Sequence, residues 1–226
     1  MKIKSIILNT EAVQATLDGR KSCTRRLVKP QPDGKHTFSL GFVTDSTEKK
    51  EIGCFGFGTD KYGGSIQFAK PSYQPGDILY VRETVWQKIG HYLDVDGETK
   101  PSWYNEFRYV ASDEKPETGW NYSWVKRPSI HMSKDAARIW LKVTDVRAER
   151  LQDITEEGAK KEGAIDNRGF IHSPNNEYDN VHTAREHFVK IWNNTIKKSN
   201  LDRYGWDASP WVWVIEFERC EKPEEI

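Results

Sequence analysis

The sequence predicts a single α+β domain in which strands outnumber helices and form a barrel-like sheet. Many segments alternate or run apolar over the length of a strand, whereas only a few segments have helical spacing. Strands and helices do not follow each other in the regular order of a doubly wound sheet. With 226 residues, of which 12% are aromatic, the chain can bury a substantial core. These observations favour a mixed barrel with a few flanking helices.

The chain begins with a predicted strand and a short helix. Residues 2–8 (KIKSIIL) have strand character, and residues 9–19 (NTEAVQATLDG) predict a helix. Asn9 or Thr10 is expected to cap the helix, and Gly19 is expected to end it. The cationic stretch GRKSCTRR therefore begins where a helix ends.

A hairpin and a long strand follow. Residues 36–45 and 51–58 are short strand-like runs joined by a polar stretch, which is typical of a hairpin. Residues 75–89 open with a Pro-Gly-Asp turn and continue as one long strand. In a regular strand Arg82 and Glu83 would point to opposite faces.

The next segment, residues 91–128, is rich in Asp, Gly, Pro and aromatic residues and lacks helical periodicity. It is expected to be an excursion with at most one strand, at residues 106–111. Its aromatic side chains could stack bases, or they could cover the open side of a barrel. These aromatic residues, with the cations between and after them, are Trp103, Tyr104, Trp120, Tyr122, Trp124, Lys126 and Arg127.

The last part of the chain alternates between strand and helix patterns. Residues 138–151 predict a long strand, and residues 155–164 predict a two-turn helix capped by Thr155. Residues 180–196 have the clearest amphipathic helical pattern, and residues 210–220 predict the final strand.

Composition limits the function classes. Lys and Arg total 34 and so do Asp and Glu, so an anionic partner must be met by a local patch. The three cysteines form no CxxC pair, which argues against a disulfide framework and a zinc knuckle. His182 and His187 are five apart, which misses the spacing for two ligands on one helical face. We expect a soluble cytoplasmic protein without metal, cofactor, signal peptide or membrane span.

The cationic stretch carries the candidate chemistry. Lys21 and Thr24 are three apart, so only a helical turn or an irregular bend would bring their side chains together, and a bend is favoured because Gly19 has just ended a helix. A lysine beside a threonine hydroxyl can act as its base, whereas two exposed side chains in a surface turn are the alternative. Cys23 is a competing nucleophile if nearby cations favour its thiolate.

Glu162 lies in the last turn of the predicted helix 155–164, where the helix dipole disfavours a carboxylate. A cationic partner such as Lys21 would offset this cost. Simple exposure to solvent is the alternative. If the site exists, the Lys21 amine should approach both Glu162 and the Thr24 hydroxyl to about 3–4 Å.

The blocks DGRKSCTRR, PGDILYVRE, VTDVRAERLQDITEEGAKKEGA and WVWVIEFE resemble, in this order, the ASCH domain family, a branch of the PUA-like β-barrels. The longer layout, with RPSIHM and YGWDASPWVWVIEFE, is similar to ASCH proteins of bacteriophages and prophages. The resemblance implies one ASCH domain over residues 1–226, with insertions at about 30–70 and 91–125. It also implies a cleft for RNA, a nucleoside or a modified base, in the cytoplasm of a bacterial host.

Small bacterial members of this family are N4-acetylcytidine amidohydrolases with a catalytic lysine, a threonine three residues later and a glutamate on a later helix. The resemblance places these roles on Lys21 as base, Thr24 as nucleophile and Glu162 as assistant. The expected substrate-binding residues are Arg25, Arg26, Arg82, Glu83, Trp86 and His131. This chain is about twice as long as those hydrolases, so a non-catalytic module for RNA or modified nucleic acid, a ribonuclease, and a phage accessory protein acting through protein contacts are the alternatives.

Overall fold

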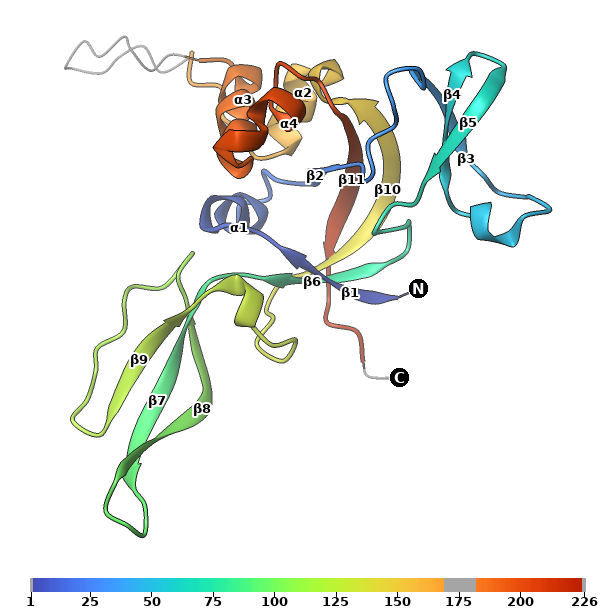
Figure 1. Ribbon diagram of the computed structural model, residues 1–226. Helices are drawn as coiled ribbons and strands as arrows, with labels where there is room; N and C mark the ends of the chain where they lie inside the picture. The colour runs from blue at the N-terminus through green and yellow to red at the C-terminus, as the bar shows by residue number, and fades with distance from the viewer. Residues whose placement is uncertain (1, 169–181, 225–226) are drawn as a thin grey trace. The chain divides into compact units, whose positions relative to one another are not determined.

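The computed structural model describes residues 2–168 and 182–224, and the chain divides into two compact units. The structure is mixed α+β, with mostly strands and few helices, as the sequence predicts (Figure 1). Each unit is assembled from segments that are distant in sequence. Unit 1 comprises Met1–Gly19, Asp77–Lys142 and Arg219–Ile226, and unit 2 comprises Arg20–Gly76 and Val143–Glu218.

The elements of unit 1 are β1 (Ile3–Ile7), α1 (Thr10–Leu17), β6 (Ile78–Arg82), β7 (Val85–Leu93), β8 (Thr99–Tyr109) and β9 (Tyr122–Arg127). Those of unit 2 are β2 (Cys23–Leu27), β3 (Phe38–Phe42), β4 (Phe55–Asp60), β5 (Gly63–Ala69), α2 (Glu156–Lys161), α3 (Ala184–Thr195) and α4 (Leu201–Tyr204). Most of β10 (Trp140–Arg150) and of β11 (Trp211–Cys220) also belongs to unit 2.

The first elements form as the sequence predicts. The Asn9 side chain accepts a hydrogen bond from the Ala12 backbone N–H at 2.9 Å and so caps α1. Gly19 follows the helix with a φ of 75°, a left-handed conformation that favours glycine. β1 pairs with β6 in parallel, with Ile6 opposite Val81, and both of these side chains are buried.

The arrangement of the sheets differs from the predicted closed barrel. The largest sheet has the strand order β1-β6-β10-β11-β2, and the two smaller sheets have the orders β3-β4-β5 and β8-β7-β9. Each sheet ends in two edge strands, so none of them closes into a barrel within the described residues. The predicted strands are present, but the predicted barrel closure is not.

The predicted long strand 75–89 is divided in the structure. β6 ends at Arg82 and β7 begins at Val85. Glu83, between them, is 1% exposed, and its carboxylate accepts two hydrogen bonds from the Arg138 guanidinium, at 2.9 and 3.0 Å. The chain therefore leaves the first sheet at this buried ion pair, and the predicted single strand forms two strands.

The segment 91–128 is also more regular than the sequence predicts. β8 and β9 both pair with β7 in antiparallel fashion and form a three-stranded sheet. The prediction of at most one strand was wrong because many side chains on these strands are aromatic or long and polar, so the segment lacks a clean apolar alternation. Cross-strand contacts between such side chains stabilise the pairing instead.

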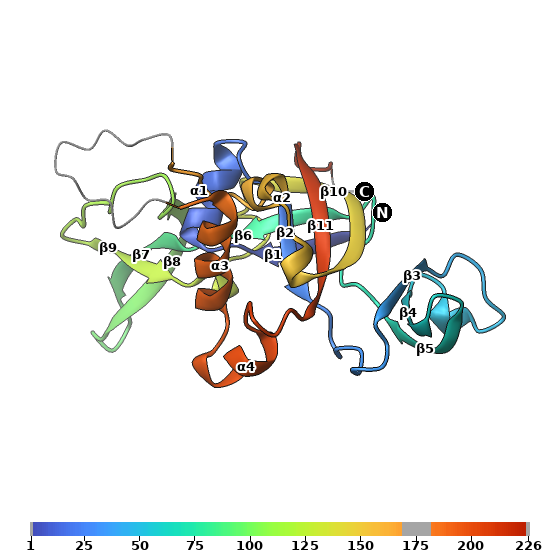
Figure 2. The same cartoon turned by 90° about the horizontal axis from the view of Figure 1, so that it is seen from above.

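The main core of unit 2 lies between its helices and one face of β2 and β11. Figures 1 and 2 both show α2 and α3 side by side next to β11. The buried residues of this core are Cys23, Leu151, Ile154, Ala159, Ala164, Ala184, Phe188, Trp192, Val212 and Val214. A separate aromatic cluster packs the β3-β4-β5 sheet against β11, with the Phe57 and Trp211 ring centroids 5.0 Å apart.

α3 begins with a capping box in which Thr183 and Glu186 satisfy each other's backbone N–H groups. The sequence predicts this helix from residue 180, and residues 180 and 181 lie outside the described residues. Within the described part of the chain, no helix has the length and apolar character needed to cross a membrane.

Candidate functional site

The cationic stretch lies in unit 2, between β11 and the end of α2. The Ser22 N–H donates to the Lys161 carbonyl at 2.9 Å, and the Phe217 N–H donates to the Ser22 carbonyl at 2.9 Å. Lys21 forms an isolated antiparallel bridge with Glu162, which is the C-cap of α2. The segment before β2 is therefore extended and held on both sides by backbone hydrogen bonds.

Lys21 and Glu162 form a buried ion pair. The Lys21 Nζ lies 2.7 Å from Glu162 Oε2 and donates a second hydrogen bond to the Glu162 carbonyl oxygen at 2.8 Å. The two side chains are 5% and 7% exposed. A carboxylate at the end of a helix is disfavoured by the helix dipole, and the lysine offsets this while satisfying a free carbonyl. The predicted approach of Lys21 to Glu162 is confirmed.

Arg25 extends this pair into a charge cluster. Its Nη1 lies 3.4 Å from Glu162 Oε1, and its Nη2 lies 3.3 Å from Glu149 Oε2. The Arg25 side chain is 3% exposed, and its guanidinium carbon lies 5.8 Å from the centroid of the Phe188 ring. Among the described residues, the buried Arg25 Nε has no hydrogen-bond partner. Glu162 is thus held between two cations.

Cys23 adjoins this cluster but is not an activated thiol. Its Sγ lies 3.9 Å from Arg25 Nη1. Burial, and next the Glu162 carboxylate, raise the pKa of Cys23 to about 12, although Arg25 and Lys21 oppose this shift. A thiol with this pKa is protonated at neutral pH, so the structure argues against Cys23 as the nucleophile.

Thr24 points away from the charge cluster. It lies in β2 opposite Ile215 of β11 and is 2% exposed. Because Cys23 and Arg25 contact each other on one face of β2, alternation places the Thr24 side chain on the other face. Within the described residues the Thr24 hydroxyl makes no hydrogen bond to Lys21 Nζ. The predicted bend that would bring these two side chains together is not formed.

A polar cavity of about 160 Å³ opens beside the cluster. It is lined by residues that include Arg25, Glu149, Arg147 and Glu216. Burial lowers the pKa of Arg147, but hydrogen bonds to Glu149, Glu216 and Asp145 outweigh burial and hold it above its ordinary value. This arginine therefore stays charged.

A larger cavity, of about 380 Å³, lies along the free edge of β2. Its lining includes Arg26, Tyr73, Trp192 and Trp213, so it combines a cation with aromatic surfaces. Burial raises the pKa of the Tyr73 hydroxyl, although Arg26 opposes the shift. Arg26 lies two residues after Thr24 in the strand, so both side chains start from the same face of β2.

The other predicted binding residues lie in unit 1. Arg82, at the end of β6, donates to the Ile130 carbonyl oxygen, and Glu83 is fully occupied by Arg138. Trp86 lies in β7, and His131 is exposed in a short 3-10 turn. The structure brings Lys21, Arg25 and Glu162 together in unit 2. The four residues Arg82, Glu83, Trp86 and His131 belong to unit 1.

Two partners in these networks were missed by the sequence reasoning, namely Glu149 for Arg25 and Arg138 for Glu83. Glu149 carries a usable signal, since Asp145, Arg147 and Glu149 alternate along β10 and so face one side of the strand. Arg138 gives no such signal, because it lies 55 positions from Glu83. Among the described residues, no group of three or more His, Cys, Asp or Glu side chains is arranged to hold a metal ion.

Comparisons with known proteins add little to this description. No protein family model matches the chain, and no curated protein matches it. Among solved structures, the crystal structure of hypothetical protein PH0355 is similar, at 12% sequence identity over 97% of this chain and 100% of that chain, with a TM-score of 0.35. A likeness at this level carries no argument about function, so the site stands on the residues of this chain.

Proposed function

We propose that this chain is a PUA-like protein of the ASCH type that removes an acyl group from the amino group of a nucleobase. N4-acetylcytidine is the model substrate. The observation that carries the proposal is the buried contact of Lys21 with Glu162, which joins residues 141 positions apart at 2.7 Å. Buried charges are retained at a cost in stability, and their clustering is typical of functional sites.

The chemistry divides into two steps. The Thr24 hydroxyl attacks the acyl carbonyl while the Lys21 amine takes its proton, and the bond between the acyl carbon and the base nitrogen then breaks as Lys21 returns that proton to the leaving nitrogen, which gives an ester on Thr24 and the free amino group of the base. Water then hydrolyses the ester and releases the acid. The Lys21 Nζ lies 2.7 Å from Glu162 Oε2, so this carboxylate is placed to accept a proton from the lysine before the amine acts as a base.

The cavity lined by Arg26 is the proposed place for the base. Its lining includes Arg26, Trp213 and Ile215 from the face of the sheet that also carries Thr24, together with Arg25 and Leu27 from the other face, and its volume of about 380 Å³ is in the range of small-molecule sites. Trp213 and Tyr73 offer apolar surfaces for a base, while Arg26 offers donors to its polar edge. The proposal requires that substrate binding bring Lys21 and Thr24 into hydrogen-bond contact, since catalytic hydrogen bonds are often made only in the complex.

The position of Thr24 also favours a second candidate, which is recognition of a modified base without reaction. In this candidate Lys21, Arg25 and Glu162 hold the strand and the helix end in place, and the cavity binds its ligand unchanged. The two candidates differ in turnover and agree on binding. Kinetics on the purified protein therefore separates them.

The test measures acetate release from N4-acetylcytidine, and from a panel of other acylated nucleosides, at high enzyme concentration. Thr24→Val keeps the shape of the side chain but removes the hydroxyl, whereas Thr24→Ser keeps the hydroxyl. We expect Thr24→Val to lose at least about a hundredfold in kcat/KM and Thr24→Ser to retain most of the activity. Binding without turnover over the whole panel would instead establish the second candidate, and turnover by Thr24→Val at the wild-type rate would exclude Thr24 as nucleophile.

A further inference from the structure

The three-stranded sheet of unit 1 carries more aromatic and cationic side chains on one face than on the other, where Arg127 lies 4.7 Å from the Trp103 ring centroid. In β7 the side chains of Trp86 and Lys88 lie on one face, and those of Val85, Gln87 and Ile89 lie on the other. The second face is partly covered within unit 1, where Val85 packs with Met132 and Ala136. The first face has a different composition and a different exposure.

We call the first face the aromatic–cationic face. The strand register places Arg108 of β8 and Lys126 of β9 opposite Trp86, and Trp124 of β9 opposite Lys88. A register shift between Gln87 and Ile89 brings further residues of β8 beside Lys88. The residues of this face are Trp86, Lys88, Tyr104, Glu106, Arg108, Tyr122, Trp124 and Lys126.

Cations and rings alternate across this face. The Lys88 Nζ lies 4.6 Å from the centroid of the Tyr122 ring and 5.6 Å from that of Tyr104. The Arg108 guanidinium lies 5.6 Å from the Trp124 ring centroid. Each cation is thus set beside a ring whose surface is also able to contact a flat ligand.

Of the four rings on this face, Tyr104 is exposed, whereas Trp86, Tyr122 and Trp124 are half-buried. Tyr104 is 47% exposed, and the Arg108 side chain is 50% exposed. The backbone under Tyr104 is Gly90, where a Cβ would lie 2.6 Å from the Tyr104 ring, so the ring lies flat on the strand. This arrangement holds the ring in place as a platform, while its outer surface faces solvent.

The charge of this face is positive. Glu106 supplies the carboxylate of this face. The Glu106 side chain lies 2.9 Å from Lys88 Nζ and 3.8 Å from Arg108 Nη2. Lys126, together with Lys115 from the neighbouring loop, lies near the Trp86 ring, and neither forms an ion pair within the described residues. Cations therefore exceed carboxylates on this face, although the whole chain has no net charge.

We propose that the aromatic–cationic face binds single-stranded nucleic acid. Bases stack on exposed aromatic rings whatever their sequence, and lysine and arginine side chains between the rings contact the phosphates. An acidic protein segment would use the cations but not the row of rings. This binding goes beyond the proposed hydrolysis, because it needs neither Lys21 nor an acylated base.

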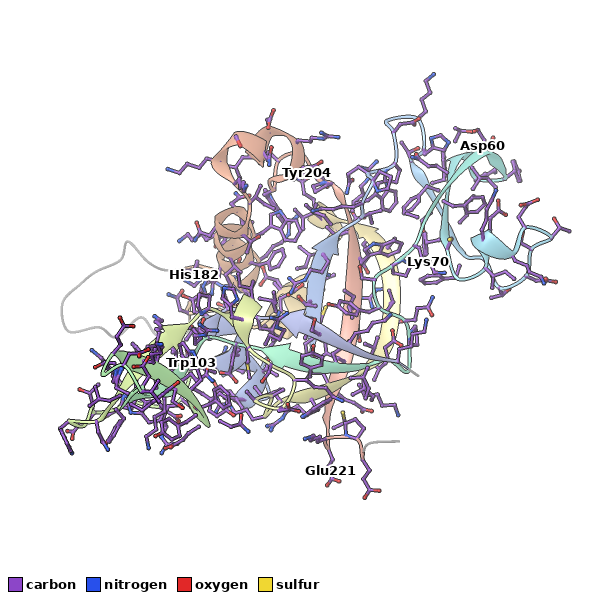
Figure 3. The ribbon with its side chains drawn as sticks, turned by 60° about the horizontal axis from the view of Figure 1, so that its bottom comes forward. Asp60, Lys70, Trp103, His182, Tyr204 and Glu221 are labelled. Carbon is purple, nitrogen blue, oxygen red and sulfur yellow. The ribbon has the colours of Figure 1, made fainter. Side chains whose placement is uncertain are left out.

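The test uses fluorescence anisotropy of a labelled oligouridine of about twelve nucleotides, a length in the range that one stacking surface covers. Two pairs of neighbouring residues provide matched variants. Tyr104 lies on the aromatic–cationic face, and Trp103 next to it lies on the opposite face with the same 47% exposure. Lys126 and Arg127 form a second pair of neighbours on opposite faces of β9. Figure 3 shows Trp103 among the side chains of this sheet.

We expect Tyr104→Ala to weaken binding by about tenfold or more, because one stacking contact is lost. Lys126→Gln should weaken binding less and reduce the slope of log Kd against log salt by about 0.7, the value for one phosphate contact with a single strand. Trp103→Ala and Arg127→Gln should leave the affinity within about twofold of the wild type, since a residue of the other face contacts no base.

Several results would overturn the proposal. They are an absence of binding at low salt, an equal loss in Trp103→Ala and Tyr104→Ala, and an equal affinity for a poly-glutamate peptide of the same charge. Lys126→Gln changes an exposed side chain without an ion pair, so it tests the face even if Tyr104→Ala does not fold. Oligouridine carries no acyl group, so a failure here is independent of any failure of the hydrolase proposal.

Discussion

One lysine–glutamate pair in unit 2 and one in unit 1 have nearly the same contact distance and differ mainly in burial. Lys21 Nζ lies 2.7 Å from Glu162 Oε2 in unit 2, with side chains 5% and 7% exposed. Lys88 Nζ lies 2.9 Å from Glu106 Oε2 in unit 1, with side chains 24% and 40% exposed. Nearly the same contact therefore exists in two very different environments.

This difference decides what each pair can do. Removing one partner of a buried pair leaves a charge without water or counter-ion, so the first pair holds its geometry strongly. An exposed pair contributes little to stability, because water competes with the contact. Lys88 can therefore exchange its carboxylate for a ligand phosphate more easily than Lys21 can leave Glu162.

Glu162→Gln should show the largest effect on stability. The substitution removes the carboxylate, so the buried positive charges of Lys21 and Arg25 lose a negatively charged partner. This should lower the free energy of unfolding by about 3–5 kcal/mol. Urea unfolding followed by circular dichroism measures this loss. A change no larger than that of an ordinary surface substitution would mean that the Lys21–Glu162 contact is not maintained in solution.

Glu106→Gln should have a much smaller effect on stability and the opposite effect on binding. The midpoint of thermal unfolding should move by less than about 3 °C, because the pair is exposed. The affinity for oligouridine at low salt should rise by about twofold to threefold, because the carboxylate of the aromatic–cationic face is neutralised. Glu11→Gln on α1 serves as the charge-matched control, and an equal rise in that variant would assign the effect to net charge alone.

Local chemistry made much of the fold predictable. Asn9 and Thr155 cap their helices as their side chains predict, and the alternating patterns of β10 and β11 give strands at the expected places. The pairing of Lys21 with Glu162 was also predictable, partly because a carboxylate at a helix end needs a cationic partner.

The features that the sequence did not predict depend on contacts between distant segments. β8 and β9 owe their pairing to ring and cation contacts across strands, which leave no apolar periodicity to detect. The position of Thr24 depends on whether the chain after Gly19 bends or extends. Backbone hydrogen bonds of Ser22 to β11 and to the end of α2 hold it extended, and nothing local in the sequence shows these partners.

The proposed hydrolysis requires the buried Lys21–Glu162 pair of unit 2 to act in catalysis as well as in folding. The most direct measurement compares acetate release from N4-acetylcytidine by Glu162→Gln and Glu149→Gln, at a temperature where circular dichroism shows both variants folded. Each substitution removes one carboxylate from Arg25, but only Glu162 contacts Lys21. We predict that Glu162→Gln loses at least about a hundredfold in kcat/KM, while Glu149→Gln stays within about threefold of the wild type. Equal losses in the two variants would contradict a catalytic role for the Lys21–Glu162 pair.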